Sequence, residues 1–149
     1  MQASTWDPQA IVVGIDGSQQ ARHATALAAS MARATGTEIH LVTVVRPPEG
    51  WWGIVSSPPT STALGNTLTD AKQQILDLVA ADVDLTDIDY QLVEEIGDPA
   101  KTLVNYASSI DADLLIVGKR GAGIVERMMI GSVANRVVHD AQCPVVIVP

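Results

Sequence analysis

Five short aliphatic runs, separated by segments with helical spacing, constrain the fold of this chain more than any other feature. The runs lie at residues 10–16, 38–45, 88–96, 113–117 and 145–148. Runs of this length and composition are typical of strands buried on both faces of a parallel sheet. Because they alternate with helical segments, the sequence predicts a doubly wound, Rossmann-like α/β domain with a five-stranded parallel sheet and about four helices. The third run is the most polar, which favours an edge position.

Residues that start and stop helices support this division. Ser18 is suited to be the N-cap of the helix that follows the first strand, and Gly36 is suited to end it. Asp98 followed by Pro99 predicts the start of another helix. Helical spacing also returns from Leu68 onward.

Length and charge limit the classes of function. The 149 residues fit a single domain over 1–149, and 47% of them are apolar although Phe is absent. A net charge of −8 argues against nucleic acid or an anionic membrane as the main partner. No apolar run reaches membrane-spanning length, and the one cysteine, Cys143, fits a reducing compartment. We therefore expect a cytoplasmic protein.

Two segments fall outside the strand and helix patterns. Residues 1–9 are polar and unpatterned, so we expect a loose N-terminus. Residues 46–66 contain four prolines and the adjacent pair Trp51 and Trp52, which predicts a long loop. An exposed aromatic pair of this kind can anchor a protein partner.

The segment from Gly118 to Ser132 is the strongest candidate for a binding site. It follows a strand, contains several glycines and precedes a helix, which together are the parts of an anion cradle. From Gly118 to Arg136 the local charge is +3. Four basic residues, Lys119, Arg120, Arg127 and Arg136, stand against one acidic residue, Glu126. The alternative is an ordinary loop with solvated charges.

Gly118, Gly121, Gly131 and Ser132 fit the pattern G-x2-G-x9-G-S. This closely resembles the nucleotide-binding signature of the universal stress protein family, in the branch whose members bind ATP. The resemblance extends to the first strand and its turn, to the helix start at Gly97-Asp98-Pro99 and to the last strand, and so covers most of the chain. It implies the strand order 3-2-1-4-5, in which the first and fourth strands are neighbours and ligands bind at their carboxyl ends.

The resemblance also implies roles for single residues. Asp16 matches an acid near the ribose and adenine, although it could instead cap the turn after its strand. Val44 matches a position whose main chain meets the adenine edge. Gly118 and Gly121 would admit the triphosphate, and Arg120 and Lys119 would neutralise it or remain solvated. Gly131 and the N–H groups of Ser132 and Val133 would hold phosphate oxygens; the Ser132 hydroxyl could also cap its helix.

The implied function is a cytoplasmic, ATP-binding universal stress protein that acts as a nucleotide-responsive binding module in the stress response. The expected ligand is ATP, with or without Mg²⁺. We expect no enzyme activity beyond weak hydrolysis, because the sequence has no catalytic triad pattern and no H-E-x-x-H motif. Its three histidines do not have the spacing of metal ligands. The alternatives are a slow ATPase or autophosphorylating enzyme, and a binder of AMP or cyclic AMP.

The last strand, Val145 to Val148, would lie at the second edge of the sheet. It contains no lysine and no interior proline, the residues that usually protect an exposed edge. Relatives commonly dimerise through this strand, so we expect a homodimer joined there. The alternative is that a loop or the N-terminal tail covers the strand.

Overall fold

A computed structural model describes residues 5–46, 73, 83–121 and 130–149. The helix expected from Leu68 onward lies outside these residues, apart from Gln73. The loop predicted at 46–66, with Trp51 and Trp52, lies outside them apart from Arg46. Within the described ranges, no helix is long and apolar enough to cross a membrane.

The sheet has the predicted architecture. Its strands are all parallel and follow the order β3-β2-β1-β4-β5, so the polar third strand and the last strand are its edges. The 3-2-1-4-5 prediction is therefore confirmed. The strand bounds are β1 Ala10–Ile15, β2 Glu38–Val45, β3 Tyr90–Ile96, β4 Leu114–Gly118 and β5 Val145–Val148.

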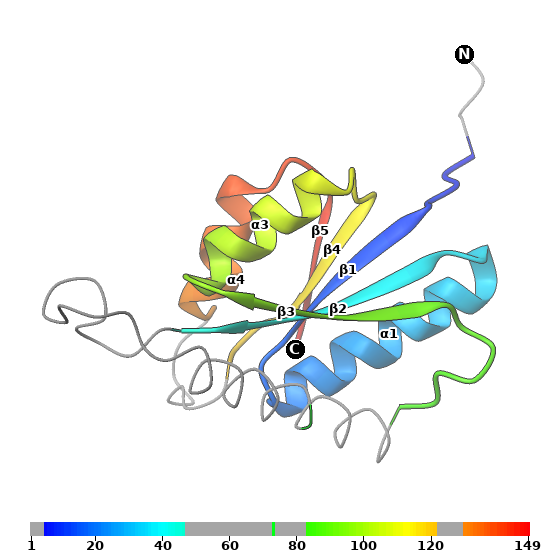
Figure 1. Cartoon of the computed structure of the whole chain (residues 1–149), viewed down its shortest axis with the longest axis horizontal. Coiled ribbons are helices and arrows are strands. Elements are labelled where there is room, and N and C mark those ends of the chain that lie inside the picture. Colours follow the sequence, from blue (N-terminus) through cyan, green and yellow to red (C-terminus); the bar gives the residue numbers. More distant parts are fainter. Residues whose placement is uncertain (1–4, 47–72, 74–82, 122–129) are drawn as a thin grey trace, which may run out of the picture.

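Helices cover both faces of this sheet. Helix α1 (Gln19–Thr35) lies on one face, and α3 (Pro99–Ser109) and α4 (Ser132–Asp140) lie on the other (Figure 1). A hydrophobic core lies on each face of the sheet, and alternate residues of the central strand β1 pack into the two cores. Ile11 packs on the α1 side and Val12 on the α3–α4 side. Both side chains are completely buried. The continuous aliphatic runs in the sequence result from this burial on two faces.

The predicted caps of the first helix are confirmed. The Ser18 side chain accepts a hydrogen bond from the Ala21 N–H at 3.1 Å. Gly36 ends α1 in the left-handed conformation, with φ 74°, and its N–H donates to the Ala32 carbonyl at 2.7 Å. Only glycine adopts this conformation without a steric cost from a Cβ atom.

The start of α4 differs from the sequence prediction by one residue. Its N-cap is Gly131, in an extended conformation with φ −69° and ψ 159°, and Ser132 is the first helical residue. The Gly131 carbonyl accepts the first intrahelical bond, from the Asn135 N–H at 3.0 Å. No side-chain cap bond is present at this end, so the suggested capping role of the Ser132 hydroxyl is wrong.

The N-terminal segment is anchored earlier than expected. Pro8 is fully buried, and its carbonyl accepts a hydrogen bond from the Thr37 hydroxyl at 2.8 Å. The Asp113 carboxylate accepts the N–H groups of Gln9 and Ala10 at 2.7 and 3.1 Å. The expectation of a loose terminus over 1–9 therefore does not hold for Pro8 and Gln9. Strand β4 begins one residue after Asp113, at Leu114.

Asp98 links the two helices on one face of the sheet. As predicted, it is the N-cap of α3, and its carboxylate accepts the Lys101 N–H at 3.1 Å. The same carboxylate lies 3.0 Å from the Arg136 guanidinium of α4. The Lys101 hydrogen bond, followed by the hydrogen bond and charge of Arg136, lowers the pKa of Asp98 below its ordinary value of 3.8. The ionised carboxylate is therefore the form that the fold stabilises.

We expect Asp98→Ala to lower the free energy of unfolding by about 1 kcal/mol at pH 7, the usual cost of losing an N-cap. Asp98→Asn should cost less, because its amide oxygen can still accept the cap bond. Urea unfolding measures both variants against the parent.

The pH dependence follows from the lowered pKa of Asp98. The stabilising contribution is present above the unfolded value near 3.8 and is lost as pH falls through the folded value. The difference between parent and Asp98→Asn should therefore shrink between pH 7 and pH ~2. A difference that stays constant over this range would contradict the assigned role of the charge.

Candidate functional site

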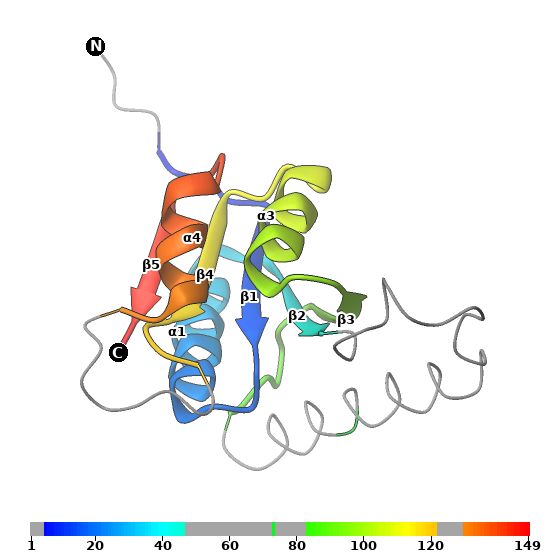
Figure 2. The same ribbon diagram turned by 90° about the vertical axis from the view of Figure 1, so that its left-hand side faces the viewer.

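A cavity of about 370 Å³ opens at the carboxyl ends of β1, β2 and β4. Its lining also includes residues of α3 and α4, the two helices that lie together on one face of the sheet (Figure 2). Its volume lies within the range of small-ligand pockets. The chain leaves β1 towards α1 on one face and leaves β4 towards α4 on the other. The cavity therefore lies at the switch point where doubly wound sheets bind their ligands.

The structure brings together all but one of the residues that the sequence predicted for the site. Arg120 is the exception: it is half-buried and is not among the lining residues. Its proposed contact with phosphate stays a prediction. The predicted residues that line the cavity are Asp16, Val44, Gly118, Gly121, Gly131, Ser132 and Val133.

One side of the cavity is formed by the start of α4 and the end of β4. The Gly131 N–H donates to the Lys119 carbonyl at 2.7 Å, and the Lys119 N–H donates to the Val148 carbonyl at 2.7 Å. The Gly131 N–H is therefore already used within the protein. The N–H groups of Ser132 and Val133, and that of Ala134 after them, have no acceptor inside α4 because the first intrahelical donor is Asn135. These three residues and Lys119 all line the cavity.

Asp16 lies between the strand ends and holds the turn that follows β1. Its Oδ1 accepts the Ser18 N–H at 2.9 Å, which is the capping contact that the sequence suggested as an alternative role. Because Asp16 also lines the cavity, the capping contact leaves a ligand-binding role open to the same side chain. Gly17 between them has φ 80° and allows the sharp turn.

Two glycines of the motif have packing roles that the sequence did not reveal. A Cβ atom at Gly118 would lie 2.7 Å from the Cβ of Gln20, in the first turn of α1. A Cβ at Gly121 would lie 2.8 Å from the Asp16 Oδ2. Glycine at these positions lets the loop after β4 approach α1 and the Asp16 carboxylate. This is a reason for glycine apart from the predicted access for phosphate.

The other side of the cavity is apolar. Val42 and Leu103 line it and are buried, and Val44 beside them is half-buried. Leu103 fits closely over the sheet because β1 has Gly14 there: a Cβ at this position would lie 2.9 Å from the leucine Cδ1. Neither Gly14 nor Leu103 was predicted from the sequence as part of the site. The sequence signals for Leu103 were the helix start at Asp98-Pro99, one turn earlier, and the apolar spacing of that helix.

Three charged residues line the cavity, each one just after the end of a strand. The charged residues of the lining are Lys119 after β4, Asp16 after β1 and Arg46 after β2. Arg46 was assigned by the sequence to the loop rather than to the site. Arg136, which was counted in the basic segment, pairs with Asp98 instead. Within the described residues, no group of three or more His, Cys, Asp or Glu side chains is arranged to hold a metal ion.

Comparisons with known proteins agree with this architecture. The family model described as the Universal stress protein family matches residues 8–149. A universal stress protein of Thermus aquaticus is 32% identical over 141 residues, which span 93% of this chain and 96% of that protein.

Solved structures are similar over nearly the whole chain. A universal stress protein in complex with cAMP is 26% identical with a TM-score of 0.62, covering 96% of this chain and 98% of that one. The universal stress protein of Archaeoglobus fulgidus in complex with dAMP is 22% identical with a TM-score of 0.60, covering 97% of this chain and 100% of that one. The second likeness shows the shared fold alone.

The contact between Gly121 and Asp16 predicts an energetic coupling that needs no ligand. Gly121→Ala should destabilise the protein by about 1 kcal/mol, because the new Cβ displaces the carboxylate and weakens its bond to Ser18. In an Asp16→Ala background the same substitution should cost much less, since the obstructed atoms are gone. Urea unfolding of the parent, both single variants and the double variant measures the coupling. Additive effects would show that the two residues do not meet.

Proposed function

Because the chain belongs to the universal stress protein family, we propose that it binds an adenine nucleotide in the cavity at the carboxyl ends of β1, β2 and β4. We propose ATP as the ligand, and a role as a nucleotide-responsive binding module in a cytoplasmic stress response. One observation carries the proposal: an apolar subsite and a helix start, whose first N–H groups have no acceptor within α4, line the same cavity. A nucleotide needs both at once. The relative in complex with cAMP supports the choice of adenine.

The lining residues fit the parts of a nucleotide in order across the sheet. The first N–H groups of α4 and the Lys119 ammonium would hold phosphate oxygens. The Asp16 carboxylate would accept a ribose hydroxyl or hold a hydrated Mg²⁺. Val44 and Leu103 would pack against the base. Strand spacing supports this order, because β1 lies between β2 and β4.

Cyclic AMP or AMP is the second candidate ligand, and the solved relative with cAMP favours it. Two features favour the triphosphate. Lys119 adds a cation beside the helix start, and the motif glycines let the backbone after β4 approach the cavity closely. Each phosphate added to the ligand gives these groups another anionic oxygen to bind.

We propose binding without efficient catalysis. In the described lining, Asp16 is the only side chain that could act as a general base near neutral pH, because the other charged groups are Lys119 and Arg46. Its Oδ1 already accepts the Ser18 N–H. A slow ATPase or an autophosphorylating protein is the alternative.

Calorimetry with ATP, AMP and cyclic AMP tests the proposed function. The parent should bind ATP most tightly, and Asp16→Ala should weaken that binding by roughly 1–3 kcal/mol. Asp16→Asn is the matched control, because it can still accept the Ser18 N–H while losing the charge; it should lose less affinity. Phosphate release by the parent should be far slower than the ~1 s⁻¹ that marks the low end of typical enzymes. A parent that binds none of the three nucleotides would refute the proposal.

We further propose that two copies of the chain associate through β5. Its outer edge is unpaired within the described sheet, and Val145, Val146 and Ile147 are each half-buried. Apolar surface continues on the helices on either side of this strand. Leu27 is 38% exposed and lies one turn after His23, whose ring contacts the Pro149 carbonyl at 3.2 Å. Val138 of α4 is 51% exposed. Pairing two such edges would satisfy backbone groups and bury this surface.

Sedimentation of the parent and of Val146→Lys tests this association. The parent should sediment as a dimer at micromolar concentration, and the lysine should shift it to monomer. Ile96→Lys is the matched control, because Ile96 is a half-exposed aliphatic residue on the opposite edge strand β3. Since Val146 packs partly against the α1 core, thermal unfolding must confirm that the variant is folded. A monomeric parent would contradict the proposal, and a dimer unaffected by the lysine would place the interface elsewhere.

A further inference from the structure

Arg46 is the one charged residue on the apolar side of the cavity. It follows the end of β2, is exposed, and lines the cavity together with Val44, two residues before it. The anion-binding groups lie on the far side, after β4. Because β1 separates the two strands, and neighbouring strands are ~4.8 Å apart, the ends of β2 and β4 are roughly 10 Å apart.

Resting on the proposed function, we propose that the Arg46 guanidinium lies over the base of the bound nucleotide and makes the site selective for purines. The floor of this subsite is aliphatic, from Val42, Val44 and Leu103. A flat base packed on that floor presents its other face to the cavity mouth, where Arg46 is exposed. A guanidinium is planar, remains charged and stacks on aromatic rings. A purine offers it a larger surface than a pyrimidine does.

The charge of Asp98 attracts the Arg46 guanidinium to this side of the cavity. The pKa of Asp98 is lowered first by the Lys101 N–H and then by Arg136, with the charge of Arg46 as a further cause. Arg46 is thus attracted towards the start of α3, where Pro99 and Leu103 line the cavity. This attraction opposes movement of Arg46 towards the start of α4, where phosphate would bind. Asp98 acts here as a positioning residue and does not itself line the cavity.

The alternative role for Arg46 is a phosphate ligand, and the two roles predict different results. A stacking arginine contributes equally to the binding affinity for adenosine, AMP and ATP. Lysine cannot replace it, because an ammonium is not planar. A phosphate-binding arginine contributes more as phosphates are added, and lysine restores much of its effect. The comparison therefore needs three ligands and two substitutions at one position.

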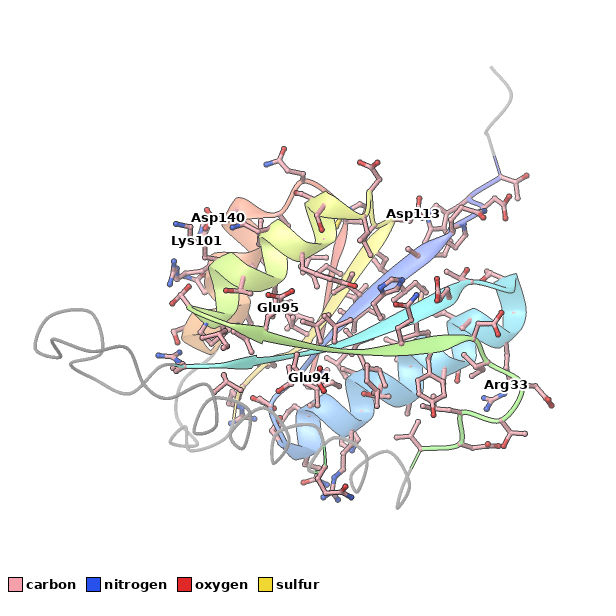
Figure 3. All side chains as sticks on the ribbon, in the orientation of Figure 1. Arg33, Glu94, Glu95, Lys101, Asp113 and Asp140 are labelled. Carbon is pink, nitrogen blue, oxygen red and sulfur yellow. The ribbon has the colours of Figure 1, made fainter. Side chains whose placement is uncertain are left out.

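The experiment measures the affinity of the parent, Arg46→Ala and Arg46→Lys for adenosine, AMP and ATP by calorimetry, with weak ligands measured by displacement. CTP is measured in the same way, because it carries a pyrimidine on the same triphosphate. Arg33→Ala is the charge-matched control. Arg33 lies in the last turn of α1. Figure 3 shows it at the opposite end of the domain from Lys101, which marks the start of α3 beside the cavity. Thermal unfolding confirms that each variant is folded.

We expect Arg46→Ala to lower the affinity for adenosine, AMP and ATP by a similar factor, roughly fivefold to tenfold. Arg46→Lys should be nearly as weak, and Arg33→Ala should match the parent. The preference of the parent for ATP over CTP should fall in Arg46→Ala. A loss confined to ATP and restored by lysine, or no loss at all, would overturn the stacking role while leaving nucleotide binding intact. A parent that binds neither adenosine nor ATP would overturn this inference and the proposed function together.

Discussion

Two backbone hydrogen bonds meet at Lys119, one donated to Val148 at the end of β5 and one accepted from Gly131 at the start of α4. They close the loop after β4 and determine where α4 begins. Because Gly131 is held there, the next N–H groups of the helix lie at the cavity, where the helix dipole also favours an anion. The side of the cavity proposed to bind an anion therefore depends on main-chain contacts, and Lys119 is the described lining residue that adds a positive charge there.

Glycine contributes to the site mainly by allowing close approach. Without a Cβ at Gly118, the end of β4 passes the first turn of α1; without one at Gly14, Leu103 packs onto the sheet. At Gly121 the missing atom leaves space that the Asp16 carboxylate occupies. Access for phosphate would account for only part of the reason that the G-x2-G-x9-G-S motif contains glycine at positions 118 and 121. The rest comes from elements on both faces of the sheet converging at the ends of three strands.

The sequence predicted the sheet well because burial on both faces leaves a strong local signal. The helix starts at Ser18 and Asp98 were also predictable, since their side chains bond to backbone groups three residues away. The start of α4 was misplaced by one residue because both glycine and serine are favoured as N-caps, and spacing does not decide between them. The role of Arg46 was not predictable, since it depends on which strands become neighbours and on a carboxylate fifty-two residues later in the chain.

That carboxylate connects the two sides of the cavity. Asp98 caps α3, which contributes Leu103 to the apolar side. It also pairs with Arg136 of α4, whose first turn forms the side proposed to bind an anion. A ligand that spans both sides of the cavity would contact α3 and α4, and these two helices are already joined through the Asp98 side chain. A movement that separates α4 from α3 would lengthen the 3.0 Å contact between Arg136 and Asp98, unless the arginine side chain extends to follow it. Because the pair is exposed, its energy is modest, so it orients the helices without locking them.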